Sequence, residues 1–425
     1  MKKISILSIM MLLCCHAMAQ IDSSVYSKFT TAQNRIKFYS YLIKNSITKN
    51  LSLPLNDSTE ENWEDAFSAM ELIYYKEPWT KIKLKIAADD LRKRSMEFQR
   101  SFMELLYATG QKDYTQQADD LFKNTANGKV FAMCAEYLLK ADSSEKNKNY
   151  IYKIAANKSN LFSNDNDSLA VVNLLKHLEK IYTNKKITTV IFFKPLFKKS
   201  YLKGNTVVYS LQRKNRNYPG ILVIKDTAGN FVTDSNGEIF RLPQLARSLS
   251  NMPGYLTNGN TPQGIYRLYG FDKSRNNFIG PTENLQLTMP FETSIRHFLK
   301  DSSITDTTWK INWYQKLLPG ALVNYQPLYE SYFASSAGRT EIIAHGTAVD
   351  AEFYKGQMYY PYTPTAGCLC TKELWNADGR RIVSDQQKLA DAVKKAGGAD
   401  GYLIVIEIND AQKPVSPEEI LPLLQ

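Results

Sequence analysis

Two short segments near the C-terminal end of the 425-residue chain carry the side chains that could perform covalent chemistry. The first is His345-Gly346, and the second, the segment 365–370 with the sequence TAGCLC, follows a tyrosine-rich stretch. A cysteine attacks a carbonyl carbon as its thiolate, and an imidazole that lies nearby can take the thiol proton. We therefore expect Cys368 to act as a nucleophile and His345 to act as its base.

The other histidines and cysteines are poorer candidates. His177 and His297 lie in segments whose spacing predicts helix, and Cys134 lies on the apolar face of a predicted helix, which is typical of a buried small side chain. Cys368 and Cys370 are separated by one residue, so a disulfide between them would be strained. The remaining cysteines, Cys14 and Cys15, belong to the N-terminal segment described next. Cys134, Cys368 and Cys370 are then an odd number, so we expect at least one thiol to stay free.

Residues 1–19 have the composition of an export signal peptide. Lys2 and Lys3 precede the apolar run Ile4–Cys15, and the triplet Ala17-Met18-Ala19 provides a small-x-small cleavage site. The apolar run is too short to span a bilayer, and no later stretch reaches the ~18 apolar residues that spanning requires. We expect an exported protein of the periplasm or cell envelope, with no integral membrane segment after signal removal.

Size and charge narrow the class of protein further. A chain of this length exceeds one compact domain, so two domains are expected. Without Lys2 and Lys3 the formal net charge falls from +11 to +9. A positive charge of this size favours anionic partners such as cell-wall carboxylates or phospholipid headgroups. The alternative is that the basic residues form a solvated cationic surface. The chain lacks zinc-ligand spacing, an RNA-reading motif and a phosphate-binding glycine loop, so we expect no metal, no cofactor and no nucleic-acid partner.

Residues 20–197 are predicted to form an all-helical domain. Apolar residues recur at helical spacing, and short polar joints separate the periodic segments. This pattern predicts antiparallel helical hairpins that stack as in a solenoid, and it indicates a scaffold or a surface for a protein partner. The periodic segments are 63–73, 84–107, 114–123, 129–140, 148–156 and 168–182.

Residues 198–425 are predicted to form a β-rich domain. Short runs of β-branched and aromatic residues alternate with turns that contain glycine and asparagine. The region 291–339 interrupts this pattern and is predicted to be a partly helical insertion, and 385–396 has the spacing of a helix. The expected strands are 206–211, 221–224, 264–270, 285–289, 340–344 and 402–407.

Three motifs in this half resemble, in order, those of the L,D-transpeptidase (YkuD-like) catalytic domain. They are the segment 261–264 with the sequence TPQG, then His345-Gly346, then the segment 365–368 with the sequence TAGC. The resemblance covers roughly residues 200–410, apart from the insertion. It implies a β-sandwich-type catalytic fold and an active-site cysteine that acts on peptidoglycan stem peptides.

Carried onto this chain residue by residue, the resemblance implies Cys368 as the nucleophile and His345 as its base. Gly346 is similar to the residue whose backbone carbonyl orients the imidazole. A glycine before the nucleophile lets the backbone approach closely, so the amides around Cys368 could hold a developing oxyanion. The residues expected to contact substrate are Thr365, Ala366 and Gly367.

The chain also departs from the family pattern at two positions. Ala366 stands where histidine is common, and Cys370 stands where an arginine is common, so a bidentate clamp for a substrate carboxylate is lost. Strand alternation would place Cys370 on the same face as Cys368, where it could crowd the nucleophile or regulate it by oxidation. The tyrosines of the intervening loop form either a lid or carbohydrate platform, or ordinary packing; they are Tyr354, Tyr359, Tyr360 and Tyr362.

The predicted function is cysteine-dependent peptidoglycan acyl transfer, in which stem peptides are either crosslinked or hydrolysed. A thiol paired with His345 is expected to be a thiolate at mildly acidic pH. One alternative is a catalytically degenerate protein that binds the cell wall, which Ala366 and Cys370 favour. Another is an envelope assembly protein that acts through its helical half. The structural alternative is that His345 ends a buried strand and that Cys368 fills a gap in the core.

Overall fold

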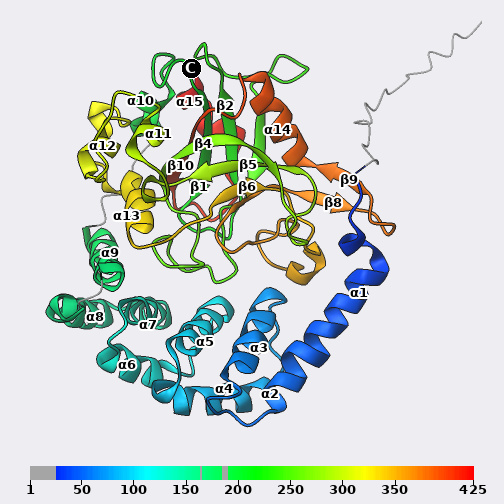
Figure 1. The fold of residues 1–425 in the computed structure, drawn as a ribbon, viewed down its shortest axis with the longest axis vertical. Helices are drawn as coiled ribbons and strands as arrows, with labels where there is room; N and C mark the ends of the chain where they lie inside the picture. Colours follow the sequence, from blue (N-terminus) through cyan, green and yellow to red (C-terminus); the bar gives the residue numbers. More distant parts are fainter. Residues whose placement is uncertain (1–24, 163–164, 184–189) are drawn as a thin grey trace, which may run out of the picture.

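The computed structural model describes residues 25–162, 165–183 and 190–425, in which a helical region precedes a region built on a β-sheet (Figure 1). This confirms the predicted order of a helical part and a β-rich part. The expected signal peptide, residues 1–19, lies outside the described residues. Within the described ranges, no helix combines the length and the apolar character needed to cross a membrane.

The helical region forms an arc beside the sheet (Figure 1). Helix α3 packs on α5, α5 on α7, and α7 on α9, whereas α4 contacts α6, so the helices form two rows. The bounds are α1 (Ala32–Tyr41), a π-helical continuation (Leu42–Lys49), α2 (Asn50–Ser52), α3 (Glu60–Leu72), α4 (Thr80–Asp90), α5 (Met96–Thr109), α6 (Thr115–Asn124), α7 (Gly128–Ala141), α8 (Glu145–Lys158) and α9 (Asp165–Thr183).

One predicted helical stretch, 84–107, is broken in the structure. Helix α4 ends at Asp90, a 3-10 turn follows, and Arg94 is extended before α5 begins. Ser95 has helical spacing in the sequence, but in the structure it caps α5, because its hydroxyl accepts a hydrogen bond from Phe98 N at 3.2 Å. A serine hydroxyl competes for backbone N–H groups, so serine is favoured at helix starts over helix interiors.

Eight strands form one mixed sheet in the order β3-β2-β1-β10-β4-β5-β6-β7. Strand β1 pairs in parallel with β10, and β10 pairs with β4 in the antiparallel sense. The sheet nearly closes, because Leu245, which follows β3, exchanges two backbone hydrogen bonds of 2.8 Å with Cys370 on β7. The bounds are β1 (Thr206–Arg213), β2 (Gly220–Lys225), β3 (Arg241–Gln244), β4 (Gly264–Lys273), β5 (Glu283–Thr288), β6 (Ile343–His345), β7 (Leu369–Cys370) and β10 (Gly401–Asn409), with a separate hairpin of β8 (Glu373–Trp375) and β9 (Arg381–Ser384).

Both faces of the central strands are buried under helices. On β1, Val207 and Tyr209 pack into a core that includes the insertion, whereas Val208 points into a second core with α14. The insertion is partly helical, as the sequence predicts. The helices of the sheet region are α10 (Lys194–Phe197), α11 (Ile295–Leu299), α12 (Ile311–Gln315), α13 (Glu330–Ser336), α14 (Asp385–Lys395) and α15 (Pro417–Leu424).

The helical region and the sheet region share a hydrophobic core through residues 251–260, which we call the bridging loop. Met252 and Leu256 of this loop are buried in the core of the helical region. Tyr255 donates its hydroxyl to Glu136 on α7 at 2.6 Å, and Asn258 Nδ2 lies 3.2 Å from Glu104 Oε2 on α5. The two regions are therefore joined by buried side chains as well as by the chain itself.

Replacing Leu256 with alanine should destabilise the whole protein, because the truncation leaves a cavity in the helical core. The expected loss in free energy of unfolding is about 2–5 kcal/mol, measured by urea denaturation. Leu161→Ala is the control, since its side chain is 71% exposed and its loss should cost at most about 0.5 kcal/mol. A cost for Leu256→Ala as small as that of the control would contradict the shared core.

Candidate functional site

Two short parallel strands bring the segment that carries Cys368 next to the strand that ends at His345. Strand β6 pairs with β7 so that Ala344 lies opposite Leu369 and His345 lies opposite Cys370. Ala344 and Leu369 are buried in the core that contains α14, so strand alternation directs His345 and Cys370 to the other face. Cys368 comes directly before β7, and its Sγ hydrogen-bonds to Ile343 N, two residues before His345.

Two of the three sequence motifs, 261–264 and 365–368, meet at the turn that precedes β7, and the third, His345-Gly346, lies at the end of the neighbouring strand β6. Thr261 Oγ1 donates a hydrogen bond to Gly367 O at 2.8 Å. Thr365 Oγ1 donates to Cys368 O at 2.9 Å and accepts from Gly367 N at 3.0 Å. These bonds fix the backbone on both sides of Cys368. They also occupy the Thr365 hydroxyl and the Gly367 N–H, whereas Ala366 is exposed.

His345 is buried and is held in one orientation by its neighbour in the chain. Its Nδ1 lies within hydrogen-bond distance of the Gly346 carbonyl oxygen. A carbonyl can only accept, so Nδ1 carries the proton and Nε2 has the free lone pair. Burial lowers the pKa of His345 to about 4, because the charged ring would lose its hydration. The imidazole is therefore neutral at pH 7, which is the form that can accept a proton.

Cys368 is a half-buried residue and forms no disulfide. Its Sγ accepts from Ile343 N at 3.5 Å and donates to Glu341 O at 3.6 Å. Burial raises the pKa of the Cys368 thiol, while the Ile343 N–H and the positive charge of Arg339 oppose that effect. The expected thiolate at mildly acidic pH is therefore not supported, because surrounding protein atoms exclude the water that would solvate the negative charge.

Within the described residues, the thiol and the imidazole do not hydrogen-bond to each other. Cys368 bonds to the backbone of the segment before β6, and His345 bonds to the Gly346 carbonyl. Catalytic hydrogen bonds are often long before substrate binds, so this arrangement is compatible with a base that engages later. Proton transfer between the two groups then needs a water molecule or a rotation of one side chain.

Cys370 is the less accessible of the two neighbouring thiols. It is 1% exposed, and burial raises the pKa of its thiol to about 12. Its Sγ lies 3.7 Å from Thr363 Oγ1, and its backbone forms the two bonds that close the sheet. The arginine that is common at this position in the family would have to be accommodated in a buried site, so cysteine here is explained by packing.

Two of the four tyrosines considered as a lid are core residues. Tyr354 and Tyr359 are buried in a small cluster with Leu245. Tyr354 also donates its hydroxyl to Leu72 O, at the end of α3, at 2.9 Å. Tyr360 is exposed at the surface. The loop therefore serves chiefly to pack the sheet region against the helical region.

The sequence analysis missed a buried carboxylate that lies against Gly346. Glu373 Oε1 accepts from Thr282 Oγ1 at 2.6 Å and from Ser384 Oγ at 2.5 Å, and burial raises the pKa of Glu373 to about 7. A Cβ added at Gly346 would overlap the Glu373 carboxylate. Glycine is therefore required at position 346 for packing, besides offering its carbonyl to His345. A single glutamate on a short strand carries no sequence signal of this contact.

Arg339, the last residue of the predicted insertion, is a second residue that the sequence analysis missed. Its guanidinium is buried and donates hydrogen bonds to carbonyl groups of the bridging loop. It also lies against Gly367, where an added Cβ would overlap its Nη2. Arg339 belongs to no sequence motif, and its place shortly before β6 is the only sequence signal of a role near the site.

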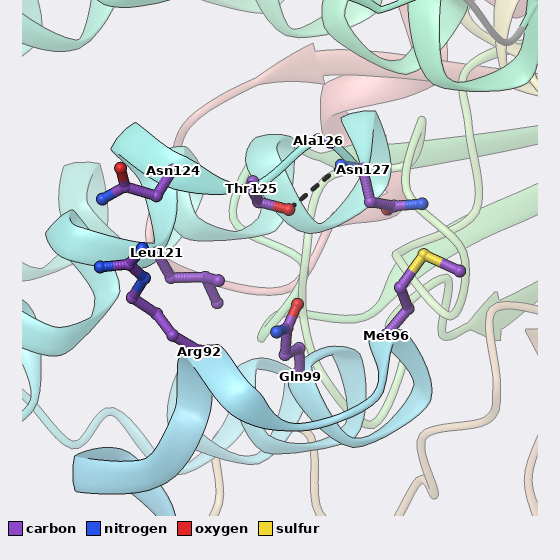
Figure 2. Close-up of a pocket in the computed structure, with 8 residues that line it drawn as sticks. All are labelled: Arg92, Met96, Gln99, Leu121, Asn124, Thr125, Ala126 and Asn127. Carbon is purple, nitrogen blue, oxygen red and sulfur yellow. Dashed lines mark hydrogen bonds between the residues drawn. The ribbon is translucent and has the colours of Figure 1, made fainter.

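The pocket in Figure 2 lies elsewhere, on the helical region. It opens between the start of α5 and the loop that joins α6 to α7, where Asn127 N donates to Thr125 Oγ1 at 3.1 Å. Its lining offers no cysteine, histidine or carboxylate, and none of its residues belongs to the candidate site. They are Arg92, Met96, Gln99, Leu121, Asn124, Thr125, Ala126 and Asn127.

Comparisons with protein-family models, curated proteins and solved structures find no match to this chain. The relation to L,D-transpeptidases is therefore a resemblance of three motifs. In the part of the chain that the structure describes, no group of three or more histidine, cysteine, aspartate or glutamate side chains is placed to hold a metal ion.

The buried neutral imidazole should make folding stability depend on pH. Because the folded-state pKa of His345 is lowered, its contribution to stability is complete above the ordinary histidine pKa of about 6.5 and is lost as the pH falls through about 4. The difference between these values corresponds to roughly 3 kcal/mol. Urea unfolding should show that wild type loses this much more stability than His345→Gln between pH 7 and pH 4. His297→Gln, at an exposed position, should follow the wild-type curve.

Gly346→Ala should destabilise the protein by about 1–3 kcal/mol, because its Cβ overlaps the Glu373 carboxylate. Gly320→Ala is the matched control, since a Cβ there meets no atom within 4 Å. In a double-mutant cycle, adding Glu373→Ala should cost less in the Gly346→Ala background than in wild type. Additive costs would show that the two residues do not collide.

Proposed function

We propose that this protein is a cysteine acyl-transfer enzyme of the L,D-transpeptidase type that acts on peptidoglycan stem peptides. The observation that carries the proposal is that the three motifs lie together: Thr261 bonds to Gly367 beside Cys368, and the Cys368 sulfur bonds to Ile343 on the strand that ends at His345. A free thiol and a neutral imidazole are the two groups that the chemistry needs. The proposal includes an envelope location, which is expected from residues 1–19.

In the proposed reaction, His345 Nε2 takes the proton of Cys368, and the sulfur bonds to the carbonyl carbon of a stem-peptide amide. The C–N bond of that amide then breaks, and the leaving amine takes the proton from the imidazolium, which leaves a thioester on Cys368. An amine of a second stem, or water, next attacks the thioester and gives its proton to His345. The sulfur leaves as a thiolate and regains that proton. An amine acceptor gives a crosslink, and water gives hydrolysis.

Local electrostatics support the thiolate once it forms. The Ile343 N–H points at the sulfur, and the Arg339 guanidinium contributes positive charge. Since burial keeps the resting thiol protonated, proton transfer and carbonyl attack should be coupled in time. We therefore expect the enzyme to rest as a thiol with a neutral imidazole, and not as a thiolate–imidazolium pair.

A second candidate function is a protein that binds stem peptides without turnover. The observation that favours it is that Cys368 and His345 each bond to backbone groups and not to each other. The substitutions at Ala366 and Cys370, relative to the family pattern, point the same way. A separate alternative is an envelope assembly protein, in which the helical region would bind a protein partner.

Incubation of the full-length protein with muropeptides, followed by mass spectrometry, distinguishes these functions. We expect a thioester adduct on Cys368 or a crosslinked or shortened product, and both should vanish in Cys368→Ala. His345→Gln should reduce turnover by about 10²–10⁴-fold, which is the usual contribution of a general base. Cys134→Ala, in the core of the helical region, is the control and should retain turnover. Binding without any product would support the second candidate. The absence of both binding and product would refute both candidates and favour the envelope assembly alternative.

A further inference from the structure

The end of α13 directs Arg339 toward the candidate site. Gly338 has a φ of +85°, which favours glycine. The N–H of Gly338 bonds to Ser335 O at 2.9 Å, and the N–H of Arg339 bonds to Ala334 O at 3.0 Å. These two bonds form a Schellman motif, which ends a helix and sets the direction of the chain that follows. Arg339 therefore leaves α13 along a fixed path.

The guanidinium of Arg339 is buried and bonds to the carbonyl groups of the bridging loop. Its Nη1 donates to Leu256 O at 3.2 Å, to Asn260 O at 2.8 Å and to Gly254 O, and its Nη2 donates to Gly259 O. Among the described residues, its hydrogen-bond partners are these carbonyl groups, and no carboxylate forms an ion pair with it. A buried positive charge without a counter-charge is costly unless another group compensates it.

The same guanidinium adjoins the nucleophile. A Cβ on Gly367, the residue before Cys368, would overlap Arg339 Nη2. Two charges act on the thiol: that of Arg339 lowers the pKa of Cys368, and that of Glu341 raises it. Glu341 is exposed, so water screens its charge. A thiolate on Cys368 would therefore provide the negative charge that the buried guanidinium lacks.

We propose that Arg339 is the positioning residue of the Cys368 site: it clamps the bridging loop against Gly367 and holds a fixed positive charge beside the sulfur. The outer side of that loop is held by Glu104 and Glu136, so the helical region takes part in placing the charge. The inference deepens the proposed function, on which it rests for the role of Cys368 as nucleophile. The effect of the Arg339 charge on the thiol belongs to the resting protein and can be measured without substrate.

The first test uses the wild-type protein and two alkylating reagents. Iodoacetate is anionic and iodoacetamide is neutral, so a cation beside the sulfur should favour the former. The ratio of the two labelling rates at Cys368, located by peptide mapping, should exceed the ratio for a free cysteine peptide severalfold. A ratio equal to or below that of the peptide would overturn the proposal.

The second test compares Arg339→Gln, which keeps donors for the carbonyl groups, with Arg339→Lys, which keeps the charge. The pH midpoint of Cys368 labelling should rise by about one pH unit in Arg339→Gln, which is about tenfold slower labelling at a fixed pH below the midpoint. It should stay near the wild-type value in Arg339→Lys. Arg296→Gln, an exposed arginine that bonds to one carbonyl, is the control and should not move the midpoint.

A folded Arg339→Gln protein with the wild-type midpoint would show that Arg339 is only structural. If Arg339→Gln does not fold, the reagent ratio in wild type decides. Failure of the proposed function looks different, because a wild-type protein that leaves muropeptides unchanged can still show the charge effect at Cys368. Loss of turnover in Arg339→Gln without a change in labelling would also count against the proposal.

Discussion

Two backbone hydrogen bonds, between Leu245 and Cys370, close the sheet, and the geometry around the thiol depends on them. Strand β7 has two residues, so it is too short to be held by one neighbour. It has β6 on one side and Leu245 on the other. The turn that carries Cys368 leads directly into this strand, so the bonds between Leu245 and Cys370 also fix the position of the thiol. Thr261 and Thr365 then fix the turn from within.

The helical region is part of this construction and not a separate attachment. Its core receives Met252 and Leu256, and its carboxylates bond to Tyr255 and Asn258 of the same loop. From the other side, Arg339 bonds to the carbonyl groups of that loop. The bridging loop thus lies between the helices and the turn before Cys368, so a change in helix packing would reach the site through backbone contacts. The helical region, which carries no functional motif, is therefore linked through the bridging loop to the region that carries the three motifs.

The parts of the fold that were predictable are those in which a periodic pattern extends over many residues. Strands β1 and β10 are long and buried on both faces, and the helices carry wide apolar stripes. Strand β7 escaped prediction because two residues form no pattern, and Ser95 was placed inside a helix because its spacing fits one although its hydroxyl favours a cap.

The candidate site was predictable only as a set of residue types in order. Cys368, His345 and Gly346 follow from motifs, and the structure places His345 at the end of β6, Gly346 directly after it, and Cys368 directly before the neighbouring strand β7. The protonation of the thiol was not predictable, since burial, which raises its pKa, is a property of the folded chain. The roles of Glu373 and Arg339 could not be predicted from the sequence either, because each residue contacts a glycine that is distant in sequence.

The place of β10 at the centre of the sheet constrains the order of assembly. It pairs with β1 on one side and β4 on the other, although it is the last strand in the chain. Long-range pairing of this kind is slow, because the entropy cost of closing a large loop comes before the stabilising contacts form. A ribosome that still holds the final segment would leave a gap in the middle of the sheet. The sheet region should therefore complete its fold only after the last strand is released.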